Sequence, residues 1–191
     1  MKLLLIADID DLHWRHGAGE AGSVDLILSL GDVADQVILE AAHAYNCSHI
    51  FAVRGNHDHN ADVPFPPPII DLHMTVQKFN GMTFGGLNGA LSPYSHDGGV
   101  IRFPFLHTQS EVCRYMSAFP PVDVLISHNS PRGVHDGDST GGGHTGFDGL
   151  VNYLYEHKPK YLFHGHQHYG QETMCDATKV FCVYGWKVME I

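Results

Sequence analysis

Five short polar segments in this chain each follow an apolar run that is typical of a buried β-strand. Strands of one sheet that end at the same edge bring together side chains that lie far apart in the sequence. Ligand sites form preferentially at such edges. The sequence therefore predicts one composite site, assembled from Asp8-Ile9-Asp10, Gly31-Asp32, Gly55-Asn56-His57-Asp58, Ser127-His128 and Gly165-His166-Gln167-His168.

The composition fits one globular domain over residues 1–191. With 43% hydrophobic residues, a chain of this length can bury a core without disulfides or another small-protein staple. The four cysteines show no C-x-x-C pair, so reduced thiols are expected. No apolar run approaches membrane-spanning length, and the apolar run at the N-terminus soon reaches acidic residues. We therefore expect a cytoplasmic protein that does not contact a membrane.

The charge balance limits the class of partner. The formal net charge is -10 with only 11 Lys+Arg, which disfavours a protein that tracks a long nucleic-acid backbone. The 16 histidines favour metal chemistry, because neutral imidazole is a common ligand of transition metals. We expect a small substrate, whereas the oligomeric state does not follow from these residues.

The hydrophobic pattern predicts the order of the elements. Helices are expected at residues 33–45, 108–119 and 147–155, the second beginning with a capping box from Thr108 to Glu111. Between residues 69 and 87, Asn80-Gly81 predicts a hairpin, because this pair accepts the positive φ values of a tight turn. Such an alternation of strands and helices is typical of an α/β fold. Strands are expected at residues 3–7, 24–30, 50–53, 122–126 and 161–163, with terminal β structure over 180–191.

The five segments supply carboxylate, amide and imidazole groups. Such a mixed set suits Mn, Fe, Zn or Ni better than Ca or Mg, which prefer oxygen ligands alone. Two ions about 3.5–4 Å apart need a shared ligand, and a carboxylate can share its oxygens between both. Asp32 is the candidate bridge. Gly31, Gly55 and Gly165 precede their segments and leave room where each strand turns.

The ordered segments resemble the calcineurin-like metallophosphoesterase family from Asp8 to His168, through the order D-x-[H], G-D-x-x-D, G-N-H-D, H and G-H-x-H. The resemblance implies a four-layer α/β/β/α sandwich of two mixed β-sheets flanked by helices, with a dinuclear centre at the strand ends. His57 matches the phosphate-contacting imidazole and general acid of that family. By position, the first metal would be held by Asp8, Asp32 and His168, and the second by Asp32, Asn56, His128 and His166.

The first segment departs from the family pattern, because Asp10 stands where a histidine is usual. If Asp10 binds metal, the first site gains a hard anionic ligand, and we hypothesise that this favours Mn(II) or Fe(III) over Zn(II). Alternatively, His13 supplies the missing imidazole, or the first site is weak and partly empty. The expected cofactors are two divalent or mixed-valence transition metal ions, with Mn or Fe favoured over Zn or Ni.

Other polar residues beside these segments have predicted supporting roles. Asp35 lies about one helical turn beyond Asp32, so it should cap the following helix or support the ligands. Asp58 is expected to support them too, and Arg54 to pair with a nearby carboxylate. Arg132 lies just beyond a predicted ligand, where its guanidinium could bind a phosphate bidentately.

This set of residues predicts a metallophosphoesterase that favours phosphodiesters. A hydroxide shared by the two metals would attack phosphorus, and His57 would protonate the leaving oxygen. Asp32 and His57 are the predicted catalytic residues, while Asn56, His57 and Arg132 are predicted to contact substrate. Two alternatives stay open. One is a non-catalytic metal-binding or protein-binding scaffold of the same fold, since the resemblance extends to the retromer subunit. The other is a nuclease that acts on short nucleic acids.

Overall fold

The computed structural model describes residues 1–9, 22–58, 63–92, 104–137 and 144–191. Their strands form two large sheets and one small sheet. The five-stranded sheet has the order β13 (Gly185–Glu190), β1 (Lys2–Ala7), β2 (Leu26–Leu30), β3 (Ile50–Val53) and β4 (Ile69–Asp71). The six-stranded sheet has the order β11 (Gln171–Cys175), β12 (Thr178–Cys182), β10 (Tyr161–His164), β9 (Val124–Ser127), β6 (Met82–Leu87) and β5 (Val76–Phe79). The small sheet pairs β7 (Ala90–Leu91) with β8 (Leu106–His107).

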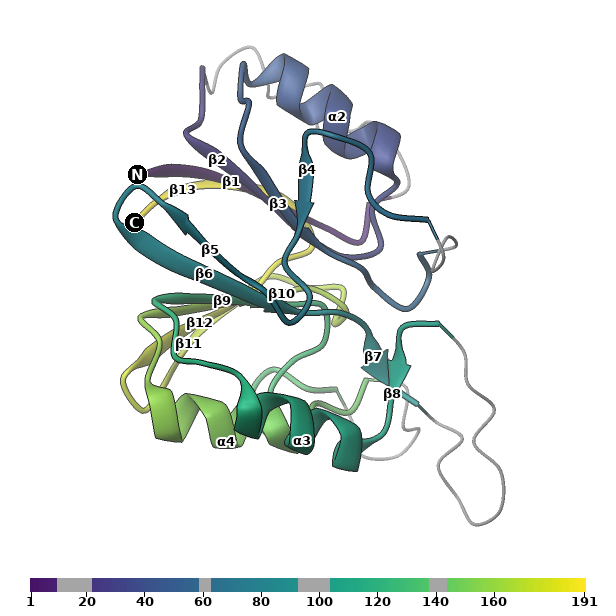
Figure 1. Cartoon of the computed structure of the whole chain (residues 1–191), viewed down its shortest axis with the longest axis vertical. Helices are drawn as coiled ribbons and strands as arrows, with labels where there is room; N and C mark the ends of the chain where they lie inside the picture. The colour runs from purple at the N-terminus through teal and green to yellow at the C-terminus, as the bar shows by residue number, and fades with distance from the viewer. Residues whose placement is uncertain (10–21, 59–62, 93–103, 138–143) are drawn as a thin grey trace.

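Helices cover the outer face of each large sheet (Figure 1). Helix α2 (Asp35–Ala44) packs on the five-stranded sheet, while α3 (Gln109–Ala118) and α4 (Asp148–His157) pack on the six-stranded sheet. The predicted four-layer α/β/β/α sandwich is therefore confirmed. None of the helices that the structure describes is both long and apolar enough to cross a membrane.

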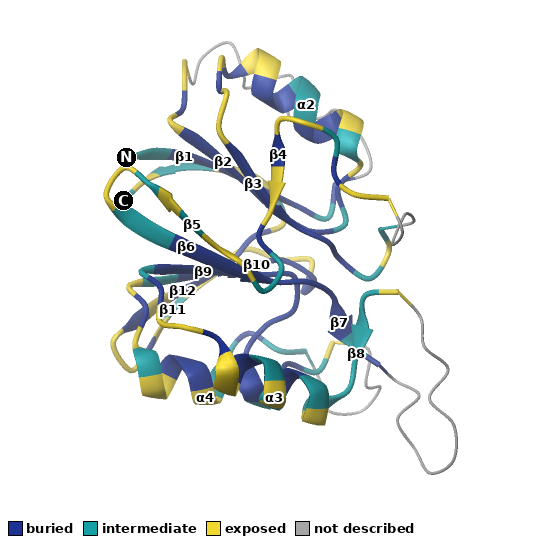
Figure 2. Ribbon diagram, in the orientation of Figure 1, coloured by how far each residue is buried: buried dark blue, intermediate teal, exposed yellow. Residues whose placement is uncertain are grey.

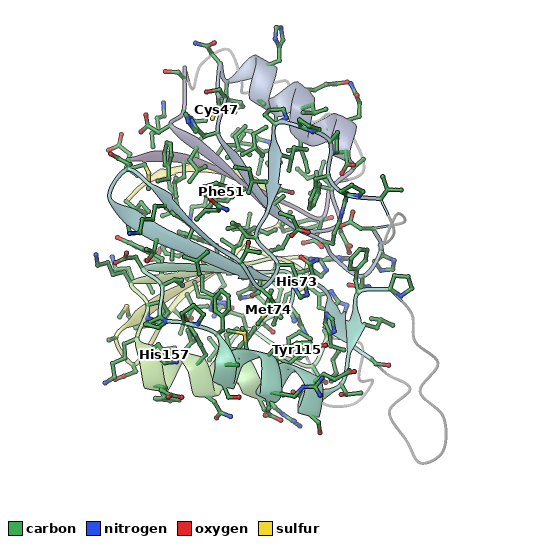
Figure 3. The ribbon with its side chains drawn as sticks, in the orientation of Figure 1. Cys47, Phe51, His73, Met74, Tyr115 and His157 are labelled. Atoms are coloured by element: carbon green, nitrogen blue, oxygen red, sulfur yellow. The ribbon has the colours of Figure 1, made fainter. Side chains whose placement is uncertain are left out.

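The core lies in three layers because the central strands are buried on both faces (Figure 2). In β1, Leu4 and Ile6 pack under α2, whereas Leu3 and Leu5 join the layer between the two sheets. Successive side chains of a strand point to opposite faces of the sheet, and both faces are buried here. The sequence of β1 is therefore apolar without interruption. Phe51 extends from β3 into the layer between the sheets, with its ring 5.4 Å from that of Phe84 (Figure 3).

Both large sheets are mixed. Strands β1 to β4 run parallel with an antiparallel edge at β13, and β6, β9, β10 and β12 run parallel between the antiparallel edges β5 and β11. The prediction that one sheet carries all the polar segments is wrong. Three segments follow β1, β2 and β3 in one sheet, and two follow β9 and β10 in the other. An apolar run shows that a strand is buried but not which sheet it joins.

Local sequence signals predicted several elements well. Helix α3 begins after the Thr108 cap, whose hydroxyl accepts from the Glu111 N–H while the Glu111 carboxylate accepts from the Thr108 N–H. Asn80 and Gly81 have φ values of 48° and 78° and join β5 to β6 as predicted. The hairpin is shorter than expected, because β4 pairs with β3 in the opposite sheet. The terminal β structure likewise divides between the sheets, with β12 in one and β13 in the other.

Candidate metal centre

Four of the five polar segments contribute to the lining of a cavity of about 620 Å³, whereas Ser127 and His128 are fully buried and do not line it. The segments come from strands whose carboxyl ends lie at one edge of the sandwich, so residues from both sheets contribute to the same space. Aspartate is the commonest residue type in the lining. The lining consists of Asp8, Asp32, Val33, Ala34, Asp35, Arg54, His57, Asp58, His168 and Tyr184.

Asp8 and Asp32 occupy equivalent places at the ends of the parallel strands β1 and β2. Both have left-handed backbone, with φ values of 54° and 53°. The Asp8 N–H donates to the Gly31 carbonyl at 3.2 Å, and the Ile9 N–H donates to the Asp32 carbonyl at 3.1 Å. This shared turn brings both carboxylates to the same edge. One ligand atom from each lies within 4.8 Å of the other and of a ligand atom of His128.

His128, at the end of β9, connects the second sheet to these carboxylates. Its Nδ1 lies 2.9 Å from the Leu30 carbonyl oxygen, and its Nε2 lies 3.0 Å from Asn56 Oδ1 and 3.3 Å from Asp32 Oδ2. A metal-binding histidine is typically oriented in this way, with its second nitrogen on a carbonyl. Burial disfavours the charged form of His128, but the hydrogen bond and charge of Asp32 outweigh it and raise the pKa of the imidazole.

Asp8 is the strongest sign that a cation belongs here. Its side chain is only 3% exposed, and burial raises the pKa of its carboxyl to about 6. Asp8 Oδ2 accepts from the His166 N–H at 2.9 Å, whereas the buried Oδ1 has no hydrogen-bond partner among the residues that the structure describes. A buried carboxylate oxygen without a partner is costly unless a cation neutralises it. The donor set and this oxygen therefore fit the metal ions that the sequence predicts.

His166 and His168 extend from the turn after β10. Both have left-handed backbone, with φ values of 69° and 56°. The His166 ring centroid lies 4.9 Å from that of His128, and His168 Nε2 lies 3.7 Å from Asp8 Oδ1. Between them, Gln167 is buried and its amide nitrogen donates to Ser130 Oγ at 3.0 Å. Gln167 thus fixes the turn that carries both histidines. The sequence did not indicate this role, because Gln167 occupies the variable position of G-H-x-H.

The supporting residues hold the backbone beneath the carboxylates. Asp58 Oδ2 accepts from the Asp32 N–H at 3.1 Å and from the Gly55 N–H at 2.6 Å. Arg54 pairs with Asp35 at 2.6 Å, which confirms the expected ion pair. Asp35 does not cap its helix, because the cap position of α2 is Ala34 and no side chain bonds there. The guanidinium of Arg54 holds the Asp35 carboxylate instead.

Three glycines are required where the segments meet. A Cβ on Gly55 would collide with the Asp32 carboxylate. Gly31 has a φ of 93°, and a Cβ there would lie 2.5 Å from His128 Nδ1. A Cβ on Gly165 would likewise crowd Asp8 Oδ2, at 2.8 Å. The predicted role of the glycines, which is to leave room for close approach, is confirmed.

Some residues named from the sequence lie elsewhere. Arg132 is exposed and pairs with Asp148 at 3.2 Å, and it is not part of the cavity lining. Asp10 and His13 lie outside the described residues. Conversely, Tyr184 lines the cavity and stacks on His168 with ring centroids 5.3 Å apart. Nothing in the pattern around Tyr184 indicated a site, because it lies between two terminal strands.

Comparisons with known proteins agree with this geometry. A family model described as calcineurin-like phosphoesterase matches residues 2–170. No curated protein matches significantly by sequence. Solved structures share the fold at low identity. The phosphopantetheinyl hydrolase PptH from Mycobacterium tuberculosis matches with a TM-score of 0.62 and 14% sequence identity. The match covers 96% of this chain and 89% of the PptH chain.

Two further structures extend this likeness. The protein TT1561 of Thermus thermophilus has a TM-score of 0.60 and 13% identity, covering 96% of this chain and 89% of its own. Vps29 from Chaetomium thermophilum has a TM-score of 0.52 and 10% identity, covering 100% of this chain and 82% of its own. Such identities show the fold alone, whereas the family model spans most of the chain. Members of this family are metal-dependent phosphoesterases that typically bind two divalent ions. The chain belongs to the calcineurin-like phosphoesterase family.

Proposed function

We propose that this protein hydrolyses small phosphodiesters at the cavity that Asp8 and Asp32 line. The observation that carries the proposal is the buried Asp8 Oδ1, which lies beside a second carboxylate and the imidazole of His128 and has no hydrogen-bond partner in the described part of the chain. Two adjacent buried carboxylates repel each other unless cations lie between them. The arrangement therefore supports a metal-dependent reaction over a metal-free one.

The ligands come from both sheets. We assign Asp32 as the shared ligand, since its Oδ2 lies 3.3 Å from His128 Nε2 and ligand atoms of Asp8, Asp32 and His128 all lie within 4.8 Å of one another. When bound, two ions, with Mn or Fe favoured, would polarise phosphate oxygens and lower the pKa of a water molecule towards neutrality. Asp8 and His168 complete one set of ligands around Asp32, and the other consists of Asn56, His128 and His166.

His57 is the proposed general acid. Its backbone N–H donates to Asp32 Oδ1 at 2.8 Å, which holds the residue beside the shared carboxylate. Its side chain is exposed and lines the cavity, so the imidazole is accessible to a substrate oxygen. As an imidazolium it would donate a proton to the leaving alkoxide or phenoxide and retain the neutral ring.

The charge of the cavity favours diesters over monoesters. The lining contains Asp8, Asp32, Asp35 and Asp58, and the guanidinium of Arg54 is already paired with Asp35. A phosphodiester carries one negative charge at neutral pH, whereas a monoester carries close to two, as the second pKa of a phosphate ester is about 6. No other lysine or arginine is in the described lining, so the second charge of a monoester would have to be met by the metal ions alone, and the singly charged diester is favoured.

Turnover with defined metals tests this function. Protein stripped of metal and reloaded with Mn(II) should hydrolyse bis(p-nitrophenyl) phosphate with a higher kcat/KM than p-nitrophenyl phosphate, and should lose both activities on chelation. Weak dependence on salt would separate this reaction from nuclease activity, which should fall steeply as salt rises. Metal binding without turnover of either ester would contradict the proposal and favour a scaffold.

Tyr184 is expected to contact the alcohol or aryl group of the substrate. It stacks on His168 at the cavity, and the residue is 54% exposed. Tyr184→Ala should raise KM for aryl diesters by about 2- to 10-fold, because an aromatic pair contributes about 0.5–1.5 kcal/mol. Steady-state kinetics with an aryl and a methyl diester measure the effect. The methyl diester and Tyr155→Ala, an exposed tyrosine on α4, are the controls. An equal rise for both esters would contradict stacking.

A further inference from the structure

A second group of ligand-type side chains lies outside the catalytic centre. His164 ends β10 and Cys182 ends β12, and the two residues are directly paired in the parallel ladder. His135 reaches them from the loop after β9. All three residues are buried, with exposures of 8% for His135, 0% for His164 and 3% for Cys182. One ligand atom from each lies within 4.8 Å of the others.

The two imidazoles face each other with their remaining nitrogens already bonded. His135 Nδ1 lies 3.1 Å from His164 Nε2. On the outer sides, His135 Nε2 lies 2.7 Å from Thr173 Oγ1, and His164 Nδ1 lies 3.0 Å from the Gly165 carbonyl oxygen. Metal-binding histidines are typically held in this way by an oxygen on the second nitrogen. The two facing nitrogens are the ones left to bind an ion.

The sulfur of Cys182 is placed as the third ligand atom. It accepts backbone hydrogen bonds from Tyr169 and Gln167, which stabilise negative charge on sulfur. Burial, helped by the charge of Asp8, nevertheless raises the pKa of the thiol to about 12. A bound cation would reverse this balance, because a coordinating thiol loses its proton to solvent as the metal–sulfur bond forms.

The geometry points to a third metal site, in which His135, His164 and Cys182 bind a zinc ion separately from the catalytic centre. Two imidazoles and one thiolate suit Zn(II) better than the hard ions that carboxylates prefer. Cys182 Sγ also bonds the backbone of Gln167, which lies between the catalytic-centre residues His166 and His168. Zinc here would therefore fix the turn that carries both histidines.

Cobalt substitution tests the site with a readout other than activity. The full chain, stripped of metal and loaded with Co(II), should show a sulfur-to-cobalt charge-transfer band in the near ultraviolet. Asp32→Asn, which disrupts only the carboxylate centre, should retain the band, and Cys182→Ser should lose it. Cys175→Ser is the matched control, since Cys175 is also buried and lies on β11 beside β12. It should retain the band.

Zinc content gives an independent measurement. Cys182→Ser and His135→Asn should each bind about one zinc ion fewer per chain than wild type, a difference that elemental analysis resolves. If Co(II)-loaded wild-type protein shows no charge-transfer band, the proposal is overturned, and this result does not depend on whether the variants fold. A band that survives in Cys182→Ser would also overturn it, leaving only a hydrogen-bonded pair of histidines. Neither result depends on phosphodiester turnover, so the proposed function is judged separately.

Discussion

Asp32→Asn is expected to reduce phosphodiester turnover by about 10³-fold, the upper end of what one preorganised charge-stabilising group contributes. In the wild-type protein the His57 N–H donates to Asp32 Oδ1 at 2.8 Å. The asparagine retains an oxygen that can accept this hydrogen bond, so the fold should survive. What is lost is the negative charge that two ions would share beside His128. Metal retention should therefore fall together with turnover.

Elemental analysis and kinetics on the same preparation check both parts of this prediction. Asp71→Asn is the control, because Asp71 is an exposed carboxylate at the end of β4, outside the cavity. That variant should match wild type in metal content and in kcat. If Asp32→Asn retained both metal and full turnover, Asp32 would not be the shared ligand.

His57→Asn is expected to retain the metals and to lose about 10²- to 10⁴-fold in rate on alkyl diesters, the usual contribution of a positioned acid. The loss should be much smaller for p-nitrophenyl diesters, since nitrophenolate leaves without needing a proton. A plot of log kcat against leaving-group pKa should therefore become steeper in the variant. His57 lines the cavity but donates to Asp32 through its backbone, so the substitution leaves that bond in place.

A histidine outside the site supplies the comparison for His57. His43 lies in the last turn of α2, is exposed and is not part of the cavity lining, so His43→Asn should leave the leaving-group dependence unchanged. Equal rate losses for good and poor leaving groups in His57→Asn would mean that His57 orients the substrate and does not protonate it.

The sequence was sufficient to predict that the polar segments meet, because that prediction depends only on strands ending at a common edge. Asp8, Asp32 and His128 do lie together. Local chemistry was equally informative where it acts within a few residues. The Thr108 cap and the Asn80-Gly81 turn formed as expected. In each case the deciding interactions join neighbours along the chain.

Predictions failed where the deciding contact is distant in sequence. Residues 69–71 looked like one arm of a hairpin, yet they pair with β3 in the opposite sheet. Of the two roles expected for Asp35, the helix cap is not observed, because Arg54, which lies 19 residues away, binds its carboxylate. The group formed by His135, His164 and Cys182 was equally hidden, because an isolated cysteine and histidine carry no spacing that indicates a metal site.

The division of the proposed ligands between two facing sheets has a consequence for stability and affinity. Asp8, Asp32 and Asn56 extend from one sheet, whereas His128, His166 and His168 extend from the other. The thickness of the apolar layer between the sheets therefore sets the gap that an ion must fit. Phe51 and Phe84 meet in that layer and help to set its thickness, although neither is among the residues described as lining the cavity. We therefore expect substitutions that change the volume of Phe51 or Phe84 to alter metal affinity as well as the stability of the fold.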